Sequence, residues 1–458
     1  MRFSVVLRYL LILLLTTLLA ACAITSVFDP YPQQARTWRN DIRSGNYPEA
    51  QALLDKKRHD ADGILYLMER GRIDMLAHDT ASSLTDFADV IARWEQLDQR
   101  ARVSLSESAA EGASLLTNDN ALPYEGEIYE KVFVHQYQAL NYLSQGRPQD
   151  ALVEVRQAEF IQRQALLAHD NQVYAAENKA RRQGFNPASF NNYFSGMNMA
   201  AGRVKNAFQN AYCFYVSALI YEAEGQLNDA YIDDKKALEI WPDNDAVRLD
   251  VLRLGSILGM SEVAHDAAQV KNLIPAPQYG SLVILFEQGF VPEKTEIKLP
   301  IITNNTTNFI AVPYYSGPFP LPQQIDFVVD DQSYIASPIV DVSALAVSSL
   351  KGHLPALLAR QWLRLLSKQK MQRELSNQAG SLGSIAGMIY NLVSEQADLR
   401  SWTTLPASAQ VSRVWAAAGL HTVQIAGVAT QVPVRAGHTT ILQVLDAGGR
   451  RSISQYSL

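Results

Sequence analysis

The chain has 458 residues, of which 48% are hydrophobic and 19% are charged, with 46 acidic and 40 basic side chains. A chain of this length and composition can bury a large core, and we expect two or more globular units. The acidic balance disfavours nucleic-acid binding, which needs a concentrated basic face, and two cysteines are too few for a disulfide framework.

The amino-terminal residues predict a secretory signal peptide over residues 1–21. A basic region with Arg2 and Arg8 precedes the apolar run 9–19, and two alanines separate that run from Cys22. The run is too short for a membrane-spanning helix, which needs about 20 apolar residues. We expect this segment to be removed, which leaves 38 basic and 46 acidic residues and a net charge of about −8.

Residues 19–22, Leu-Ala-Ala-Cys, resemble the lipobox of bacterial lipoproteins. The resemblance implies cleavage before Cys22, linkage of its sulfur to diacylglycerol, and acylation of the new amino terminus with a palmitate-like chain. Several acyl chains hold a protein firmly on a membrane, because each buried methylene contributes about 0.8 kcal/mol. Ala23, where an inner-membrane lipoprotein carries Asp, implies the outer membrane. The alternative is an ordinary signal peptide with an incidental cysteine.

The region 22–274 predicts a helical array. Gly146 and Gly225 lie in the same pattern, with an alanine and a tyrosine before the glycine and two alanines after it at identical spacings. The pattern resembles the tetratricopeptide repeat, a helix-turn-helix unit of 34 residues, which is also the offset from Gly225 to Gly259. We therefore expect an α-helical tetratricopeptide-like repeat array followed by an α+β domain.

A polar insertion near residues 165–207 separates the two best repeats. It is rich in Asn, Arg and Gly, and is either a solvated loop or a segment that contacts a partner. Cys213 follows in an apolar run, where we expect a buried and inert thiol.

Pro275 and Pro277 break the helical pattern and mark a linker to a second domain at 278–458. This domain is predicted to be an α+β unit with inserted helices, whose first and last strands pair in one sheet. Short runs bounded by turn residues predict strands at 281–289, 295–303, 308–315, 325–331, 421–427, 430–435 and 439–446. A helical stretch is expected at 354–375, and a Gly-rich stretch follows at 380–399.

Two stripes of side chains are candidate partner-binding surfaces. Three aromatic residues recur every four positions along one helix: Tyr129, Phe133 and Tyr137. They either grip a peptide in the groove of the repeats or pack against the next helix. Three basic residues have the same spacing in the second domain: Arg360, Arg364 and Lys368. They either contact anionic lipid headgroups and acidic cell-wall peptides or form a solvated face.

The sequence contains none of the common catalytic or metal-binding motifs. There is no His-Glu-x-x-His, no Gly-x-Ser-x-Gly, no phosphate-binding Gly-x4-Gly-Lys and no cysteine pair for zinc. We therefore expect no catalytic residue, no metal ligand and no cofactor. His135 is interpreted as a packed or hydrogen-bonded helix residue.

Two stretches, 122–146 (LPYEGEIYEKVFVHQYQALNYLSQG) and 397–406 (ADLRSWTTLP), resemble signature segments of a family of bacterial repeat-containing lipoproteins. The resemblance implies no particular reaction and favours a lipid-anchored periplasmic scaffold in envelope assembly or its regulation. Such a scaffold would bind envelope protein partners through the repeats and the outer membrane through its anchor. The alternative is a glycan-binding or peptidoglycan-modifying protein acting through the C-terminal domain, with Trp402 stacking on sugars.

Overall fold

The structure, a computed structural model, describes residues 29–104, 122–168, 178, 180–182, 184–266, 275–303, 306–394 and 396–458. In helix α15, side chains are described up to residue 370. The predicted signal peptide and Cys22 lie outside the described residues.

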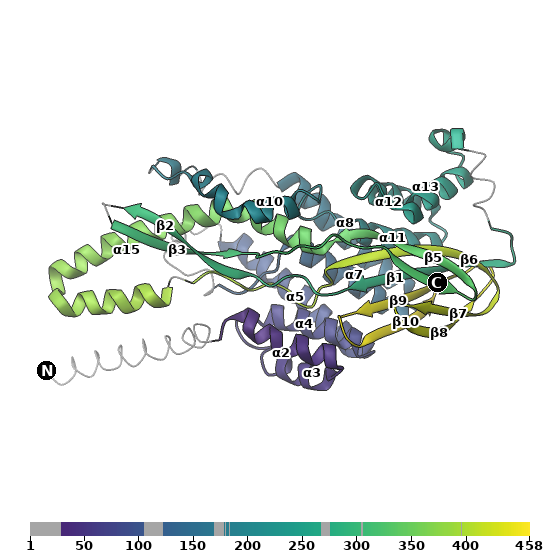
Figure 1. Cartoon of the computed structure of the whole chain (residues 1–458), viewed down its shortest axis with the longest axis horizontal. Helices are drawn as coiled ribbons and strands as arrows, with labels where there is room; N and C mark the ends of the chain where they lie inside the picture. The colour runs from purple at the N-terminus through teal and green to yellow at the C-terminus, as the bar shows by residue number, and fades with distance from the viewer. Residues whose placement is uncertain are drawn as a thin grey trace.

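Helices make up the first part of the chain (Figure 1). They are α2 (Tyr31–Ser44), α3 (Tyr47–Asp55), α4 (Gly63–Leu76), α5 (Thr80–Ser104), α7 (Ile128–Ser144) and α8 (Pro148–Ala168). These are followed by η2 (Pro187–Phe194), α10 (Ser195–Ala201), α11 (Ala211–Ala223), α12 (Leu227–Ile240), α13 (Asp245–Ile257) and η3 (Ser261–Asp266).

Local sequence signals set the ends of several of these helices. Gly146 and Gly225 adopt positive φ angles of 67° and 71° in the turns after α7 and α11, a conformation that glycine tolerates best. The Asn210 side chain accepts hydrogen bonds from two amides in the first turn of α11, and Asn244 does the same for one amide of α13. Helices α7–α8 and α11–α12 therefore form two helical hairpins.

The prediction of a tetratricopeptide-like array is wrong as a description of the fold, since the helical part is not shown to be a repeat array. The two hairpins contact each other through α8 and α11, but their first helices also pack against the C-terminal part of the chain. Helix α7 contacts α15 and β10, and α11 contacts β5. In an array these helices would line an open groove, whereas here a sheet and a long helix cover them.

The C-terminal part is built around a mixed sheet of eight strands in the order β10-β9-β1-β6-β5-β4-β7-β8. The strands are β1 (Tyr279–Gln288), β4 (Ile325–Val329), β5 (Gln332–Asp341), β6 (Ser408–Ala417), β7 (Gly419–Ile425), β8 (Val428–Val434), β9 (Thr439–Asp446) and β10 (Arg451–Ser457). Only the β1–β9 pair is parallel. The first and last strands expected from the sequence, β1 and β9, therefore do pair in one sheet.

The sheet curls until its end strand β8 approaches β9 and β1, which makes it nearly closed and barrel-like (Figure 1). The Thr440 hydroxyl donates to the Pro433 carbonyl across this gap, at 2.8 Å. A Cβ on Gly280 would lie 2.1 Å from the Arg435 carbonyl oxygen, so only glycine fits where the start of β1 meets the end of β8. The expected α+β domain is thus corrected to a nearly closed mixed sheet.

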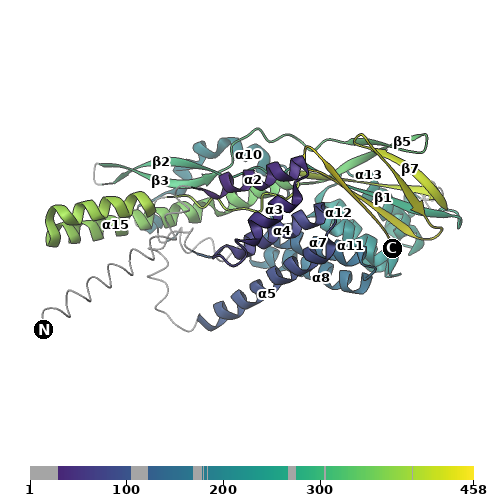
Figure 2. The same cartoon turned by 90° about the horizontal axis from the view of Figure 1, so that it is seen from below.

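An arm extends from this body (Figures 1 and 2). It contains the antiparallel hairpin of β2 (Thr295–Thr303) and β3 (Thr306–Tyr314), which forms a separate two-stranded sheet. It also contains α15 (Val342–Ser394), which lies between β5 and β6 in sequence and packs against β3 and α10.

Strand β1 joins two layers of core because its side chains alternate between them. Leu282, Ile284 and Phe286 enter the inside of the curled sheet, where they pack with apolar residues of the other strands. Val283 and Leu285 belong to a larger cluster that contains residues of the helices, the arm and the sheet. The helical and C-terminal parts therefore share one continuous apolar core.

Candidate functional site

Buried polar contacts join the helices to the C-terminal part of the chain. We call this set the polar seam. It consists of Asp62, Glu69 and Arg72 near or on α4, Glu130 and Tyr137 on α7, Tyr212 on α11, Glu287 on β1, and residues 398–404 of the loop before β6.

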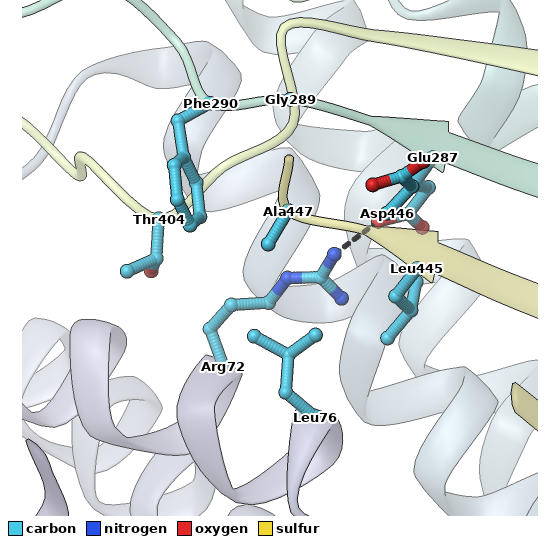
Figure 3. Close-up of a pocket in the computed structure, with 9 residues that line it drawn as sticks. All are labelled: Arg72, Leu76, Glu287, Gly289, Phe290, Thr404, Leu445, Asp446 and Ala447. Atoms are coloured by element: carbon cyan, nitrogen blue, oxygen red, sulfur yellow. Dashed lines mark hydrogen bonds and ion pairs between the residues drawn. The ribbon is translucent and has the colours of Figure 1, made fainter. Parts of the chain in front are cut away.

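The centre of the seam is an ion pair between Arg72 and Glu287, whose side chains are both almost fully buried. Figure 3 shows the Arg72 guanidinium pointing from α4 toward the Glu287 carboxylate on β1. Tyr137 and Tyr212 each donate a hydroxyl to Glu287 at 3.0 Å, and Arg72 lies over the Tyr137 ring at 4.5 Å. Burial raises the pKa of both tyrosines well above the usual value, so the hydroxyls keep their protons and act as donors.

A small cavity lies beside this pair (Figure 3). Its lining includes Arg72, Glu287, Phe290 and Asp446, and its volume is about 10 Å³, which corresponds to about one water molecule. A cavity of this size has no room for an organic substrate. The contacts of Arg72 and Glu287 therefore join α4, α7 and α11 to β1.

Two buried glutamates of the helices hold the loop that precedes β6. Glu69 accepts hydrogen bonds from the Thr403 amide and hydroxyl, both at 2.7 Å, and from the Thr404 amide at 3.1 Å. Glu130 accepts a hydrogen bond from the Trp402 amide at 2.8 Å. It also accepts one at 2.9 Å from the amide of Glu127, the residue before its own helix α7. Burial raises the pKa of both carboxyls, and these hydrogen bonds partly offset that rise.

Arg400 extends the seam toward the start of α4. Its guanidinium pairs with Asp62 and, at 2.7 Å, with Asp398, and it donates to the Leu122 carbonyl at 2.8 Å. The Lys294 ammonium donates to the Arg400 carbonyl at 2.9 Å. Residues from three distant parts of the sequence are thus bound to one arginine.

A second charged cluster joins α11 and α13 to β6. Arg413 of β6 contacts Glu222 at 2.9 Å and Asp250 at 3.1 Å, and Arg253 contacts the same two carboxylates at 2.7 and 3.0 Å. Burial alone would raise the pKa of Glu222, but the two guanidinium groups lower it to about 2. Both arginines also lie over the Trp415 ring. Each charge has an opposite charge beside it, as a structural ion-pair cluster requires.

The structure places the predicted aromatic stripe inside the protein. Tyr129, Phe133 and Tyr137 are almost completely buried, and Phe133 packs on Tyr137 with ring centroids 5.6 Å apart. Tyr137 also packs against Phe87 of α5 and against Trp402, with ring centroids 6.3 and 5.9 Å apart, so this stripe belongs to the core between the helices. Buried in this way, they present no surface to a partner peptide.

The predicted basic stripe is not an exposed face either. Arg364 and Lys368 are buried in α15, Arg360 is half-buried, and Arg364 donates to Gln361 at 3.3 Å. Trp402 is completely buried between Phe87 and Tyr137, with centroids 5.9 Å from each, and so offers no ring face to a sugar.

The two remaining residues singled out from the sequence are also internal. Cys213 is buried, and burial raises the pKa of its thiol well above the usual value, which makes the thiolate unfavourable. His135 is buried, and its Nδ1 lies 2.6 Å from a carboxylate oxygen of Glu154.

An exposed apolar stripe on α8 was not foreseen. Its three members are spaced by seven residues and are 46–71% exposed: Val153, Phe160 and Leu167. The exposed Arg156 and Arg163 flank it, with Arg163 over the Phe160 ring at 5.9 Å. The heptad spacing was readable in the sequence, but which face of α8 is free depends on how α7 and α11 cover the other side.

Within the described residues, no group of three or more His, Cys, Asp or Glu side chains could hold a metal ion. One described stretch, Val342–Lys370 in α15, is long and apolar enough to cross a membrane by length and composition. However, 67% of its most apolar window is buried inside the molecule, as in a helix that packs in a protein core.

Comparison of the chain with protein-family models, with curated proteins and with solved structures found no significant match.

Proposed function

We propose that this protein is a lipid-anchored scaffold of the bacterial envelope that holds a partner protein at the outer membrane, on its periplasmic side. Cys22, behind a basic region and an apolar run, supports the lipid anchor. The observation that supports partner binding is the exposed apolar stripe on α8, because its members recur at the seven-residue spacing of helix–helix contacts.

The stripe fits one kind of partner, an amphipathic helix that carries acidic side chains. The apolar residues of the stripe recur every seven positions, at Val153, Phe160 and Leu167. This heptad spacing is typical of the contact positions between two helices packed along their length. Arg163 lies along the same face and complements an acidic residue at the edge of such a helix, whereas Arg156 already donates to the Tyr221 hydroxyl and to Gln226, both at 3.3 Å. The partner would therefore bind outside the helical layer and not in a groove of repeats.

The interior supports the same function. The buried charged side chains of the polar seam and of the Arg413 cluster form ion pairs or accept hydrogen bonds. The cavity beside Arg72 has room for about one water molecule. These contacts join the helices and the sheet into one body, whose outer surfaces remain for a partner.

Replacement of Cys22 by Ser tests the anchor. We expect the wild-type protein to incorporate labelled palmitate and to sediment with outer membranes, whereas Cys22→Ser does neither, because the acceptor sulfur is lost. Cys213→Ser is the matched control and should behave as the wild type. Membrane association of Cys22→Ser equal to that of the wild type would contradict the proposal.

A further inference from the structure

The β2–β3 hairpin has one covered and one exposed face. Directly paired residues share a face, so Leu299 and Ile310, which pair, lie on the inner face and are buried in the main core. Pro300 and Phe309 also pair and lie on the outer face, together with Ile302. Ile302 is 74% exposed and Phe309 is 52% exposed, so the outer face is apolar and uncovered at the hairpin's far end.

The base of this hairpin is tied to the first described helix. Arg36 and Arg39 of α2 form ion pairs with Glu293, two residues before β2, at 2.8 and 2.7 Å. The other end of α2 contacts the turn between β9 and β10, where the Arg43 carbonyl accepts from the Arg450 amide at 3.2 Å. The amino-terminal end of α2 therefore points away from the curled sheet and toward the arm, as Figure 2 shows.

The length of the connecting chain allows Cys22 and the far end of the hairpin to meet the same surface. Cys22 lies nine positions before Tyr31, the first residue of α2, and this stretch spans at most about 30 Å even when fully extended. Strand β2 also has nine residues and is about 30 Å long. A bilayer that holds a lipid on Cys22 thus lies within reach of the far end of the hairpin.

We propose that the outer face of the β2–β3 hairpin docks on the lipid bilayer, with Ile302 and Phe309 inserted among the acyl chains as a second attachment point. The proposal rests on the lipid anchor proposed above. Exposed aliphatic and aromatic side chains partition favourably into the interface of a lipid bilayer. Lys298 lies on the same outer face, closer to the base of the hairpin, and forms an ion pair with Glu296. Its long side chain can extend to anionic lipid headgroups.

The test couples the protein to vesicles by chemistry that does not depend on lipidation in cells. A chain of residues 22–458 is attached through the Cys22 thiol to maleimide lipid in vesicles of phosphatidylethanolamine and phosphatidylglycerol. Cys213 is buried and does not compete. Phe309→Trp reports on the hairpin, and Leu420→Trp, at a 66% exposed position on β7 of the curled sheet, is the matched control.

We expect the added fluorescence of Phe309→Trp to shift to shorter wavelength and to be quenched by lipids brominated on their acyl chains. The Leu420→Trp fluorescence should show neither effect. Equal quenching of the two variants, or no quenching of Phe309→Trp, would overturn the docking proposal. The absence of quenching is also the result expected if the hairpin binds a protein instead of lipid. Failure of palmitate labelling in cells would contradict the anchor alone, so the two failures are distinguishable.

Discussion

Replacement of Arg72 by Met is expected to lower the free energy of unfolding by about 3–5 kcal/mol. The change leaves the Glu287 carboxylate buried next to two tyrosines without its positive partner. Denaturant unfolding followed by far-ultraviolet circular dichroism and by tryptophan fluorescence measures the loss. Both signals should shift together, because the helices and the sheet share one apolar core.

Two variants make this result interpretable. The double variant Arg72→Met with Glu287→Gln should recover much of the loss, since it removes both charges and keeps a group that can accept the tyrosine hydrogen bonds. Arg36→Met removes an arginine that is 63% exposed in its ion pair with Glu293, so it should cost less than about 1 kcal/mol. A loss for Arg72→Met as small as that for Arg36→Met would contradict the role of the seam.

Replacement of Trp402 by Ala is expected to cost about 3–5 kcal/mol, because it empties a large, fully buried site. The indole packs against Phe87 and Tyr137, and its Nε1 donates to the Thr404 hydroxyl at 3.0 Å. Thermal and denaturant unfolding of the purified variant measure the cost.

Trp402→Phe is the control for this site, since it keeps an aromatic ring and loses only part of the volume and one hydrogen bond. Its cost should be well below that of Trp402→Ala. A Trp402→Ala variant as stable as the wild type would show that the loop 398–404 is not a structural part of the core.

Much of the local structure was readable from the sequence. Apolar runs between turn residues marked β1, β2, β3, β4, β7, β8 and β9, and the glycine turns marked the two helical hairpins. Strands β5, β6 and β10 were not expected, because polar residues interrupt their apolar pattern, as in SAQVSRVWAA and RSISQYS. Arg413 illustrates the reason: it is a charged residue in a strand, balanced by acids on α11 and α13 that no local pattern reveals.

The assembly of these elements could not be read in the same way. The alanine and glycine spacings describe how two helices approach within a hairpin, and they do not describe what covers the hairpin's other face. Here α7 and α11 face a sheet and a long helix that come from the other half of the chain. One signal of the seam was present in the sequence: Glu287 directly follows the apolar run 282–286, and a buried acid requires donors.

The most direct measurement for the proposed scaffold is site-specific photocrosslinking in intact cells that express the full chain. A photoreactive phenylalanine analogue replaces Phe160 on α8, and the same analogue at Leu420 on the curled sheet is the exposed control. We expect a crosslink from position 160 to one defined envelope protein, absent at position 420 and lost when Val153 and Leu167 are changed to Glu. The same products from both positions, or a crosslink at position 160 that survives those changes, would contradict the proposed scaffold.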